Sequence, residues 1–181
     1  YFISHGEFLA EEIRNNFECD QIQSFGSLIN NSFKKIEFHP VKKIQIILQY
    51  RTKRRKEISG GVKMESWESL LGKPNDFLFE TVLIFCKRNC LDLEIIGCGN
   101  NEEEMEYLDS KIDYQFKYIY GLKEYSSYSA ISNDSIIVGI DSTLLYESFG
   151  RGGRVGFFHI RSPFIDNESF RFCWPFLQEE A

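Results

Sequence analysis

The chain has 181 residues, a formal net charge of −6, 43% hydrophobic residues and 27% charged residues, which is the composition of an ordinary globular protein. This length suits one well-buried domain, or one domain with a remnant of another. The acidic balance argues against a dedicated nucleic-acid binder, and the apolar stretches are too short to span a membrane.

Strand and helix patterns alternate along the whole chain. In chain order we expect a strand over 1–4, a helix over 7–17, strands over 22–25 and 43–50, a helix over 75–90, a strand over 91–96, a helix over 102–109, a strand over 116–120, a helix over 125–131, a strand over 135–140, a helix over 142–150 and a strand over 155–160. Strands separated by helices imply crossover connections and therefore a parallel sheet. The sequence predicts an α/β fold with a Rossmann-like, doubly wound parallel sheet.

Three segments differ in character. Residues 40–162 hold the clean strand–helix units and form the predicted nucleotide-binding domain. Residues 1–39 are interpreted as the end of a preceding domain and a linker, and 163–181 as an aromatic C-terminal tail that packs on the domain or on a partner. The chain begins at Tyr1 without Met or a signal-peptide pattern, which is compatible with a piece of a longer protein, and whether it is one stays open.

The start of the helix predicted at 142–150 is the first candidate site. An apolar strand stops at Asp141, and Ser142 and Thr143 follow with two hydroxyls beside the unpaired N–H groups of a helix start. Such a start suits a phosphate oxygen, although Asp141 or Ser142 can equally be a simple helix cap. Glu147, on the same helix, could accept two hydrogen bonds from ribose hydroxyls, or it could be a solvated surface carboxylate.

A dense basic run, which includes Arg51, Lys53 and Arg54, follows the strand predicted at 43–50. It should lie at the carboxyl edge of the sheet, facing the same cleft, where it could neutralise a diphosphate or an anionic sugar. The alternative is a solvated loop.

Other catalytic patterns are absent or incomplete. Gly97 and Gly99 follow a strand, but the third glycine of a dinucleotide fingerprint is missing and glutamates come next. There is no G-x-S-x-G, HExxH or P-loop. Five cysteines without CxxC pairing indicate a reduced, cytoplasmic compartment and no metal site, and Cys86 and Cys90 should face the core from one helix.

The block DSTLLYE at 141–147, followed by GRGGRV at 150–155, resembles the carboxyl-terminal domain of GT-B type glycosyltransferases. More narrowly, it is similar to bacterial surface-carbohydrate biosynthesis proteins. The resemblance implies that a nucleotide-sugar donor places its phosphates at the helix start and its ribose on Glu147. It also implies that the loop around Tyr120 contacts the base, and that Arg51, Lys53 or Arg54 offsets leaving-group charge.

A GT-B enzyme needs two such domains, and this chain holds one. The resemblance therefore implies a glycan acceptor bound by a second domain or chain, with His5 and Glu7 as the candidates for a catalytic contribution. It implies no metal and no cofactor beyond the donor substrate, no nucleic acid, no integral membrane segment, and a cytoplasmic location with peripheral attachment to the inner membrane as one option.

Two other functions share this fold. One is a sugar-nucleotide epimerase or hydrolase, which would need acid–base carboxylates and histidines that the chain offers sparsely. The other is a non-catalytic, flavodoxin-like binding module. The base, the sugar, the acceptor and the stereochemical outcome stay open.

Overall fold

The computed structural model describes residues 2–4, 11, 14–15, 21–24, 27, 29–50, 71–97, 102–120, 125–140 and 142–158. The chain divides into two compact units, Tyr1–Lys35 and Ile36–Ala181. In the first, the short strands β1 (Phe2–Ser4) and β2 (Ile22–Ser24) pair in parallel, and a single 3-10 turn, η1, covers Asn30–Ser32. The helix expected over 7–17 falls mostly outside the described residues.

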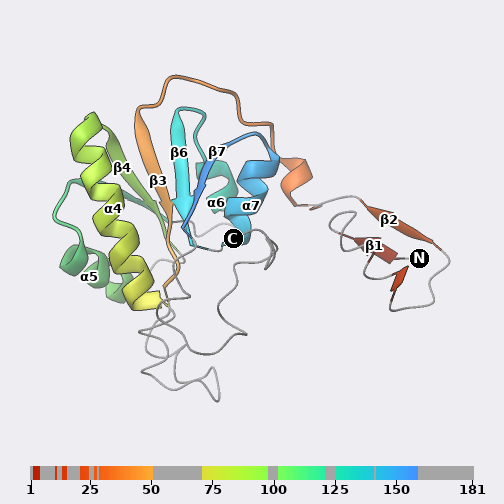
Figure 1. Cartoon of the computed structure of the whole chain (residues 1–181), viewed down its shortest axis with the longest axis horizontal. Coiled ribbons are helices and arrows are strands. Elements are labelled where there is room, and N and C mark those ends of the chain that lie inside the picture. The colour runs from red at the N-terminus through yellow and green to blue at the C-terminus, as the bar shows by residue number, and fades with distance from the viewer. Residues whose placement is uncertain are drawn as a thin grey trace, which may run out of the picture. The chain divides into compact units, whose positions relative to one another are not determined.

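The second unit is built on a five-stranded, fully parallel sheet (Figure 1). Its strand order is β5-β4-β3-β6-β7. The strands are β3 (Lys43–Ile47), β4 (Asp92–Ile96), β5 (Phe116–Ile119), β6 (Ser135–Gly139) and β7 (Arg154–Phe157). The predicted Rossmann-like α/β fold is confirmed.

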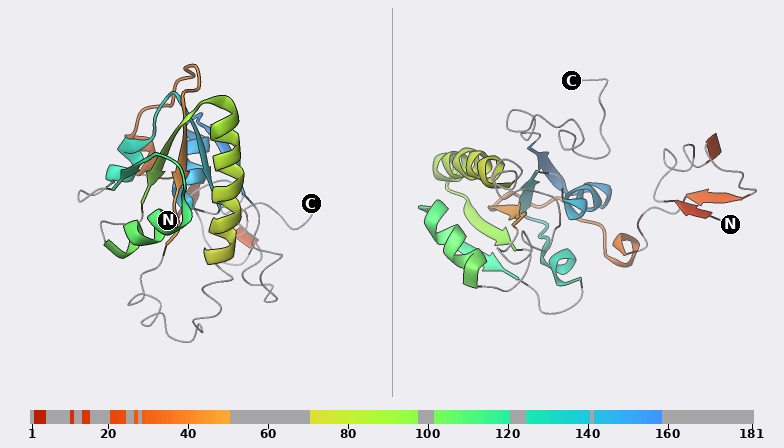
Figure 2. Two further views of the ribbon diagram at one scale, coloured as in Figure 1. Left: turned by 90° about the vertical axis from the view of Figure 1, so that its left-hand side faces the viewer. Right: turned by 90° about the horizontal axis from the view of Figure 1, so that it is seen from below.

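Helices cover both faces of this sheet (Figure 2, right). On one side lie α4 (Lys73–Asn89) and α5 (Glu102–Lys111), and on the other α6 (Ser126–Ala130) and α7 (Thr143–Gly150). We call these the α4 face and the α6 face. Side chains alternate along a strand, so Ile44 and Ile46 of β3 enter the core under α4, whereas Ile47 enters the core under α7.

The strand order fixes one special point in the sheet. The chain builds outward from β3 through β4 to β5, and then returns to place β6 on the other side of β3. The order therefore reverses between β3 and β6. Open α/β sheets bind ligands at such a switch point, outside the carboxyl ends of the strands.

The turn from α7 into β7 explains two glycines of the GRGGRV block. Gly152 has a φ of 93°, a left-handed conformation that other residues adopt only with strain. A side chain on Gly153 would place its Cβ 2.9 Å from the carbonyl oxygen of Ser148 and 3.0 Å from Ile137. Both glycines therefore allow the backbone to turn tightly from α7 into β7.

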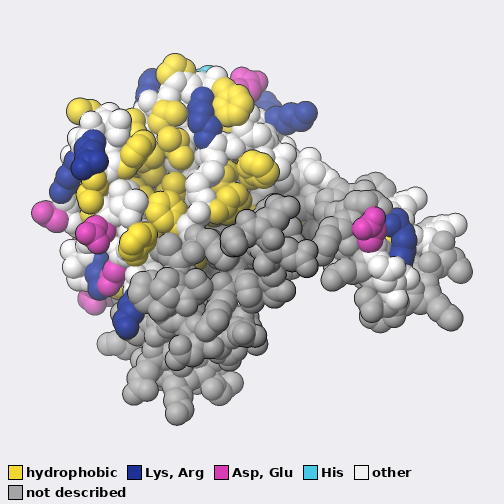
Figure 3. Space-filling view, in the orientation of Figure 1, with side chains coloured by type: hydrophobic (Ala, Val, Ile, Leu, Met, Phe, Trp, Pro, Cys, Tyr) yellow, Lys and Arg dark blue, Asp and Glu magenta, His cyan; other side chains and the backbone are white. Residues whose placement is uncertain are grey.

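Helix α4 carries hydrophobic side chains on its exposed side as well as on the side that is buried against the sheet. Phe77, Ile84 and Phe85 remain about half exposed on this helix, and hydrophobic side chains gather on this side of the molecule (Figure 3). The aromatic tail at 163–181 lies outside the described residues. Its expected packing on the domain or a partner, and the division of the chain into the three predicted segments, stay predictions.

The two cysteines of α4 do not share an environment, so the expectation that both face the core is wrong for one of them. Cys86 is fully buried, whereas Cys90 is exposed. The helix ends at Asn89, and Cys90 adopts a left-handed conformation with a φ of 53°, which turns it off the helical face. Burial raises the pKa of the Cys86 thiol to about 11.

These environments predict different thiol reactivities. Cys90 should be alkylated by iodoacetamide in the native protein at pH 8, because its exposed thiol is accessible to the reagent. Cys86 should react only on unfolding, because it is both buried and protonated. Peptide mass spectrometry with and without denaturant measures both sites, and equal native reactivity would contradict the assignment.

Gly153→Ala should destabilise the protein by about 1–3 kcal/mol, because the added methyl has no room against the Ser148 carbonyl. Gly150→Ala is the matched control, since Gly150 is the exposed last residue of α7 and alanine favours a helix. Urea unfolding of both variants measures the difference. A Gly153→Ala protein as stable as Gly150→Ala would show that this turn is not tightly packed.

Candidate functional site

The predicted phosphate site lies at the carboxyl end of β6, where α7 begins. Ser142 occupies the N-cap position with an extended backbone (φ −68°, ψ 136°), and its side chain makes no capping hydrogen bond to the described residues. Thr143, the first residue of the helix, is exposed. The N–H of Leu145 donates to the Ser142 carbonyl at 2.9 Å. The structure thus places both hydroxyls at a helix start beside the switch point.

A glycine allows α7 to approach the sheet this closely. A Cβ on Gly139, the last residue of β6, would lie 3.2 Å from the Ile47 carbonyl and 3.5 Å from the Leu145 side chain. Leu145 is fully buried against Ile47 and Ile137. Close packing of helix on strand at this edge therefore fixes where α7 starts.

Glu147 faces α6 rather than bulk solvent. The Tyr128 hydroxyl donates a hydrogen bond to Glu147 Oε2, and Arg151 lies with its guanidinium carbon 5.9 Å from the Tyr128 ring centroid. Burial and the neighbouring Glu147 carboxylate raise the pKa of Tyr128, and burial lowers the pKa of Arg151. Glu147 therefore ties α7 to α6, and any ligand contact it makes must share the carboxylate with Tyr128.

Tyr120 follows β5 directly and is 45% exposed. The Tyr118 and Tyr120 ring centroids lie 5.4 Å apart. The other predicted site residues lie outside the described ranges, so their roles stay predictions: Asp141, Arg51, Lys53, Arg54, His5 and Glu7.

The segment just before the basic run is anchored to the helices of the α4 face. The Tyr50 hydroxyl donates to Glu103 Oε1 at 2.9 Å, and its ring lies 5.0 Å from that of Tyr107. Asn75 Nδ2 donates to the Gln49 carbonyl at 2.8 Å. Burial and the acceptor Glu103 raise the pKa of Tyr50, so this hydroxyl stays protonated and can donate. Gln49 and Tyr50, the last described residues before the basic run, are therefore held in place at the carboxyl edge of β3.

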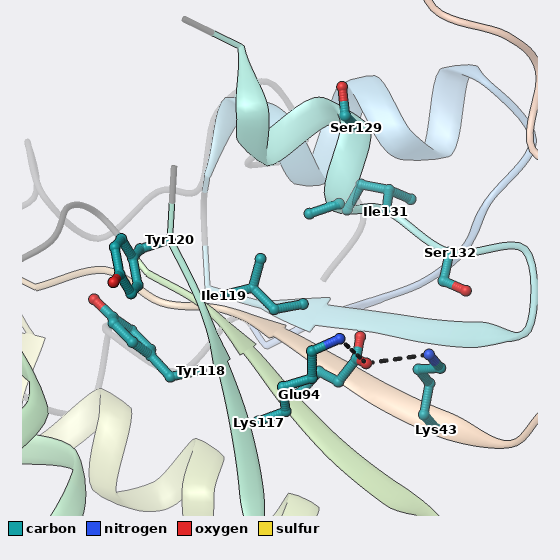
Figure 4. A pocket seen from close by; sticks show the side chains of 10 residues that line it. Lys43, Glu94, Lys117, Tyr118, Ile119, Tyr120, Ser129, Ile131 and Ser132 are labelled. Atoms are coloured by element: carbon teal, nitrogen blue, oxygen red, sulfur yellow. Dashed lines mark hydrogen bonds and ion pairs between the residues drawn. The ribbon is translucent and has the colours of Figure 1, made fainter. Parts of the chain in front are cut away.

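The sequence did not predict a second candidate site, a pocket of about 490 Å³ on the α6 face (Figure 4). It is lined by residues of β3, β4, β5 and the α6 region: Lys43, Glu94, Lys117, Tyr118, Ile119, Tyr120, Ser129, Ala130, Ile131 and Ser132. In the close-up the side chains of Ile119, Lys117, Glu94 and Lys43 lie on one side of the β5 ribbon, whereas those of Tyr118 and Tyr120 lie on its other side. On the α6 face the pocket thus has an ionic end at Lys43, Glu94 and Lys117, with the apolar side chain of Ile119 beside it.

The ionic end rests on a buried amide. Gln45 Nε2 donates to Glu94 Oε2 and to the Ala130 carbonyl, each at 2.8 Å. Gln45 Oε1 accepts from the Ser132 N–H at 3.0 Å and the Ser135 hydroxyl at 2.8 Å. All four hydrogen-bonding positions of the amide are filled, so Gln45 holds the segment leading into β6 against the middle of the sheet.

Glu94 is held between two lysines. Its Oε1 accepts from Lys43 Nζ at 3.1 Å and lies 3.5 Å from Lys117 Nζ. Gln45, Glu94 and Lys117 pair in register across three adjacent strands. The sequence does contain a signal for this pocket: Gln45 in β3 and Glu94 in β4 are polar residues in the interior of strands that are otherwise mostly apolar. Only the register shows that the two share a face.

None of the helices in the described part of the chain is long and apolar enough to cross a membrane. Within the same residues, no three His, Cys, Asp or Glu side chains gather closely enough to hold a metal ion.

By fold, the second unit is a Rossmann-like α/β domain with a helix start at its switch point. A family model described as "putative O-antigen biosynthesis protein" matches residues 1–181, so the chain belongs to that family. No curated protein and no solved structure gives a significant match. The resemblance is thus supported at the level of bacterial surface-polysaccharide biosynthesis.

Tyr128→Phe should lower the free energy of unfolding by about 1–3 kcal/mol, because it removes a hydrogen bond to a half-buried carboxylate. Tyr120→Phe is the control, since the Tyr120 ring is exposed. The folded protein holds Tyr128 protonated more firmly than the unfolded chain does, so wild-type stability from this group falls as pH rises above about 10.

The difference between wild type and Tyr128→Phe should therefore be constant below that pH and shrink above it. Urea unfolding at several pH values measures this difference. Equal effects of Tyr128→Phe and Tyr120→Phe at neutral pH would show that the Glu147 contact does not stabilise the fold.

Proposed function

We propose that this chain is the donor-nucleotide-binding part of a glycosyltransferase that builds bacterial surface polysaccharide. The observation that carries the proposal is the place of α7, which starts at the carboxyl end of β6 beside the switch point of the sheet. Doubly wound sheets bind nucleotides at this point, and helix N-termini favour phosphate. Family membership in O-antigen biosynthesis supports a substrate from polysaccharide assembly.

The phosphates of a nucleotide-sugar would lie on the first turn of α7. Ser142 and Thr143 offer hydroxyls next to backbone N–H groups, and the helix dipole adds partial positive charge. The basic residues Arg51, Lys53 and Arg54 follow β3, the other strand at the switch point, and would supply the remaining positive charge. Fixed positive charge at a departing nucleotide lowers the barrier to sugar transfer, with no metal or other cofactor required.

Glu147 would bind the ribose while Tyr128 fixes its orientation. An ionised carboxylate can accept about four hydrogen bonds, so the bond from Tyr128 leaves capacity for sugar hydroxyls. Tyr120 would border the base at the end of β5, and Asp141 would contribute at the helix start.

The rest of the reaction belongs to a second domain or chain. That part would bind the glycan acceptor, and the residues around His5 and Glu7 are the candidates from this chain for acid–base help. Nucleotide-sugars are cytoplasmic donors, so the proposal places the reaction in the cytoplasm or at the inner surface of the membrane.

The sharpest test uses Thr143, an exposed residue at the first position of α7. Thr143→Glu should preserve or slightly raise stability, because a carboxylate there complements the helix dipole, yet it should abolish binding of a phosphate group. Thr143→Gln is the neutral control of nearly the same size. Thermal-shift and calorimetric titrations with CMP, UDP, GDP and their sugars measure binding.

We expect at least one nucleotide to stabilise the parent and Thr143→Gln by about 2.7 kcal/mol at a hundredfold excess over Kd, and to leave Thr143→Glu unchanged. Equal stabilisation of Thr143→Glu and Thr143→Gln would place the phosphates elsewhere. No stabilisation of the parent by any nucleotide would overturn the donor-binding proposal.

A further inference from the structure

We propose that the pocket on the α6 face binds an uncharged, hydroxyl-rich saccharide at a site separate from the nucleotide. The pocket volume of about 490 Å³ lies within the usual range for small-ligand sites. Its chemistry changes from apolar at Ile119 to ionic at Glu94, Lys43 and Lys117 (Figure 4).

The charges at the ionic end favour a neutral ligand. Lys43 and Lys117 both approach Glu94 Oε1, and Lys43 Nζ also lies 3.8 Å from Asp134 Oδ1. Two ammonium groups therefore face two carboxylates. An anion in the pocket would meet Glu94, and a cation would meet both lysines, so neither gains a clear electrostatic advantage.

Hydroxyl groups fit these neighbouring positive and negative charges better than any single ion does. A hydroxyl can donate to a carboxylate and accept from an ammonium at the same time, and both bonds are charge-assisted. Neighbouring hydroxyls on a sugar ring repeat that pair of functions. Glu94 and Lys117 pair in register on adjacent strands and so present one acceptor and one donor side by side.

The carboxylate is oriented before any ligand arrives. Glu94 is 7% exposed, and Gln45 holds Oε2 at 2.8 Å from the buried side. Burying this charge costs free energy that an apolar residue would avoid. A rigidly held acceptor in a pocket wall reduces the entropy lost on binding, which gives the buried charge a function.

The other end of the pocket suits the apolar face of a sugar ring. Ile119 contributes an apolar side chain, and Ser129 and Ser132 line the side formed by the α6 region. No residue of α7 lines the pocket. Tyr120 borders both proposed sites, so the decisive variants are placed at the ionic end.

Saccharide binding is tested on the full chain with D-glucose, D-galactose, L-rhamnose and N-acetyl-D-glucosamine, by saturation-transfer NMR and calorimetry. Lys117→Gln removes the donor at an exposed position, and Glu94→Gln removes the charge with little change of shape. Lys87→Gln is the matched control, an exposed lysine on α4, across the sheet from the pocket. Thr143→Glu tests independence from the nucleotide site.

We expect at least one sugar to bind, with Kd raised roughly tenfold by Lys117→Gln and by Glu94→Gln, and unchanged by Lys87→Gln and Thr143→Glu. Binding of none of the four sugars would overturn the proposal, as would equal affinities of Lys117→Gln and Lys87→Gln. Displacement of the sugar by inorganic phosphate would also overturn it, because it would identify an anion site. Loss of sugar binding in Thr143→Glu alone would show that the sugar and the nucleotide share one site, and it would overturn the proposal of a separate saccharide site.

Discussion

The second unit depends on β3, the central strand, which pairs in parallel with β4 on one side and β6 on the other. Its residues alternate between two environments. Ile44 and Ile46 fill the core under α4, while Gln45 and Ile47 face α6 and α7. Because both neighbours take their register from this one strand, β3 determines the switch point at the carboxyl edge and the polar row on the α6 face.

Gln45 is the residue that makes this arrangement specific. An amide in the middle of a central strand is costly unless every polar atom is paired, and here all four positions are used. Two of its partners, Ser132 and Ser135, lie where the chain re-enters the sheet after crossing from β5. The amide thereby favours the correct return of the chain to β6, and it also supports Glu94 in the pocket wall.

The regular elements could be predicted from sequence because their signals are local. Apolar β-branched runs mark β3, β4 and β6, and Pro74 near the start of α4 marks a helix entry. The pocket could not be predicted, because it arises from pairing between residues far apart in the chain. Gln45 and Glu94 are 49 positions apart and meet only through the register of β3 and β4. Glu147 was expected as a ligand contact, and no local pattern shows that Tyr128 shares its carboxylate.

The two halves of the sequence block at 141–155 lie at opposite edges of the sheet. The part at 141–147 follows the carboxyl end of β6, whereas the part at 150–155 runs from the end of α7 through a turn into the first residues of β7 at the amino edge. There Arg154 donates to the carbonyls of His39 and Asn133, and Gly153 permits close backbone packing. The residues at 150–155 are therefore required by the fold, whereas those at 141–147 would be required by the proposed binding site. Only the first half, with the helix start at Ser142, bears on ligand binding, so variants at Thr143 test function where variants at Gly153 test folding.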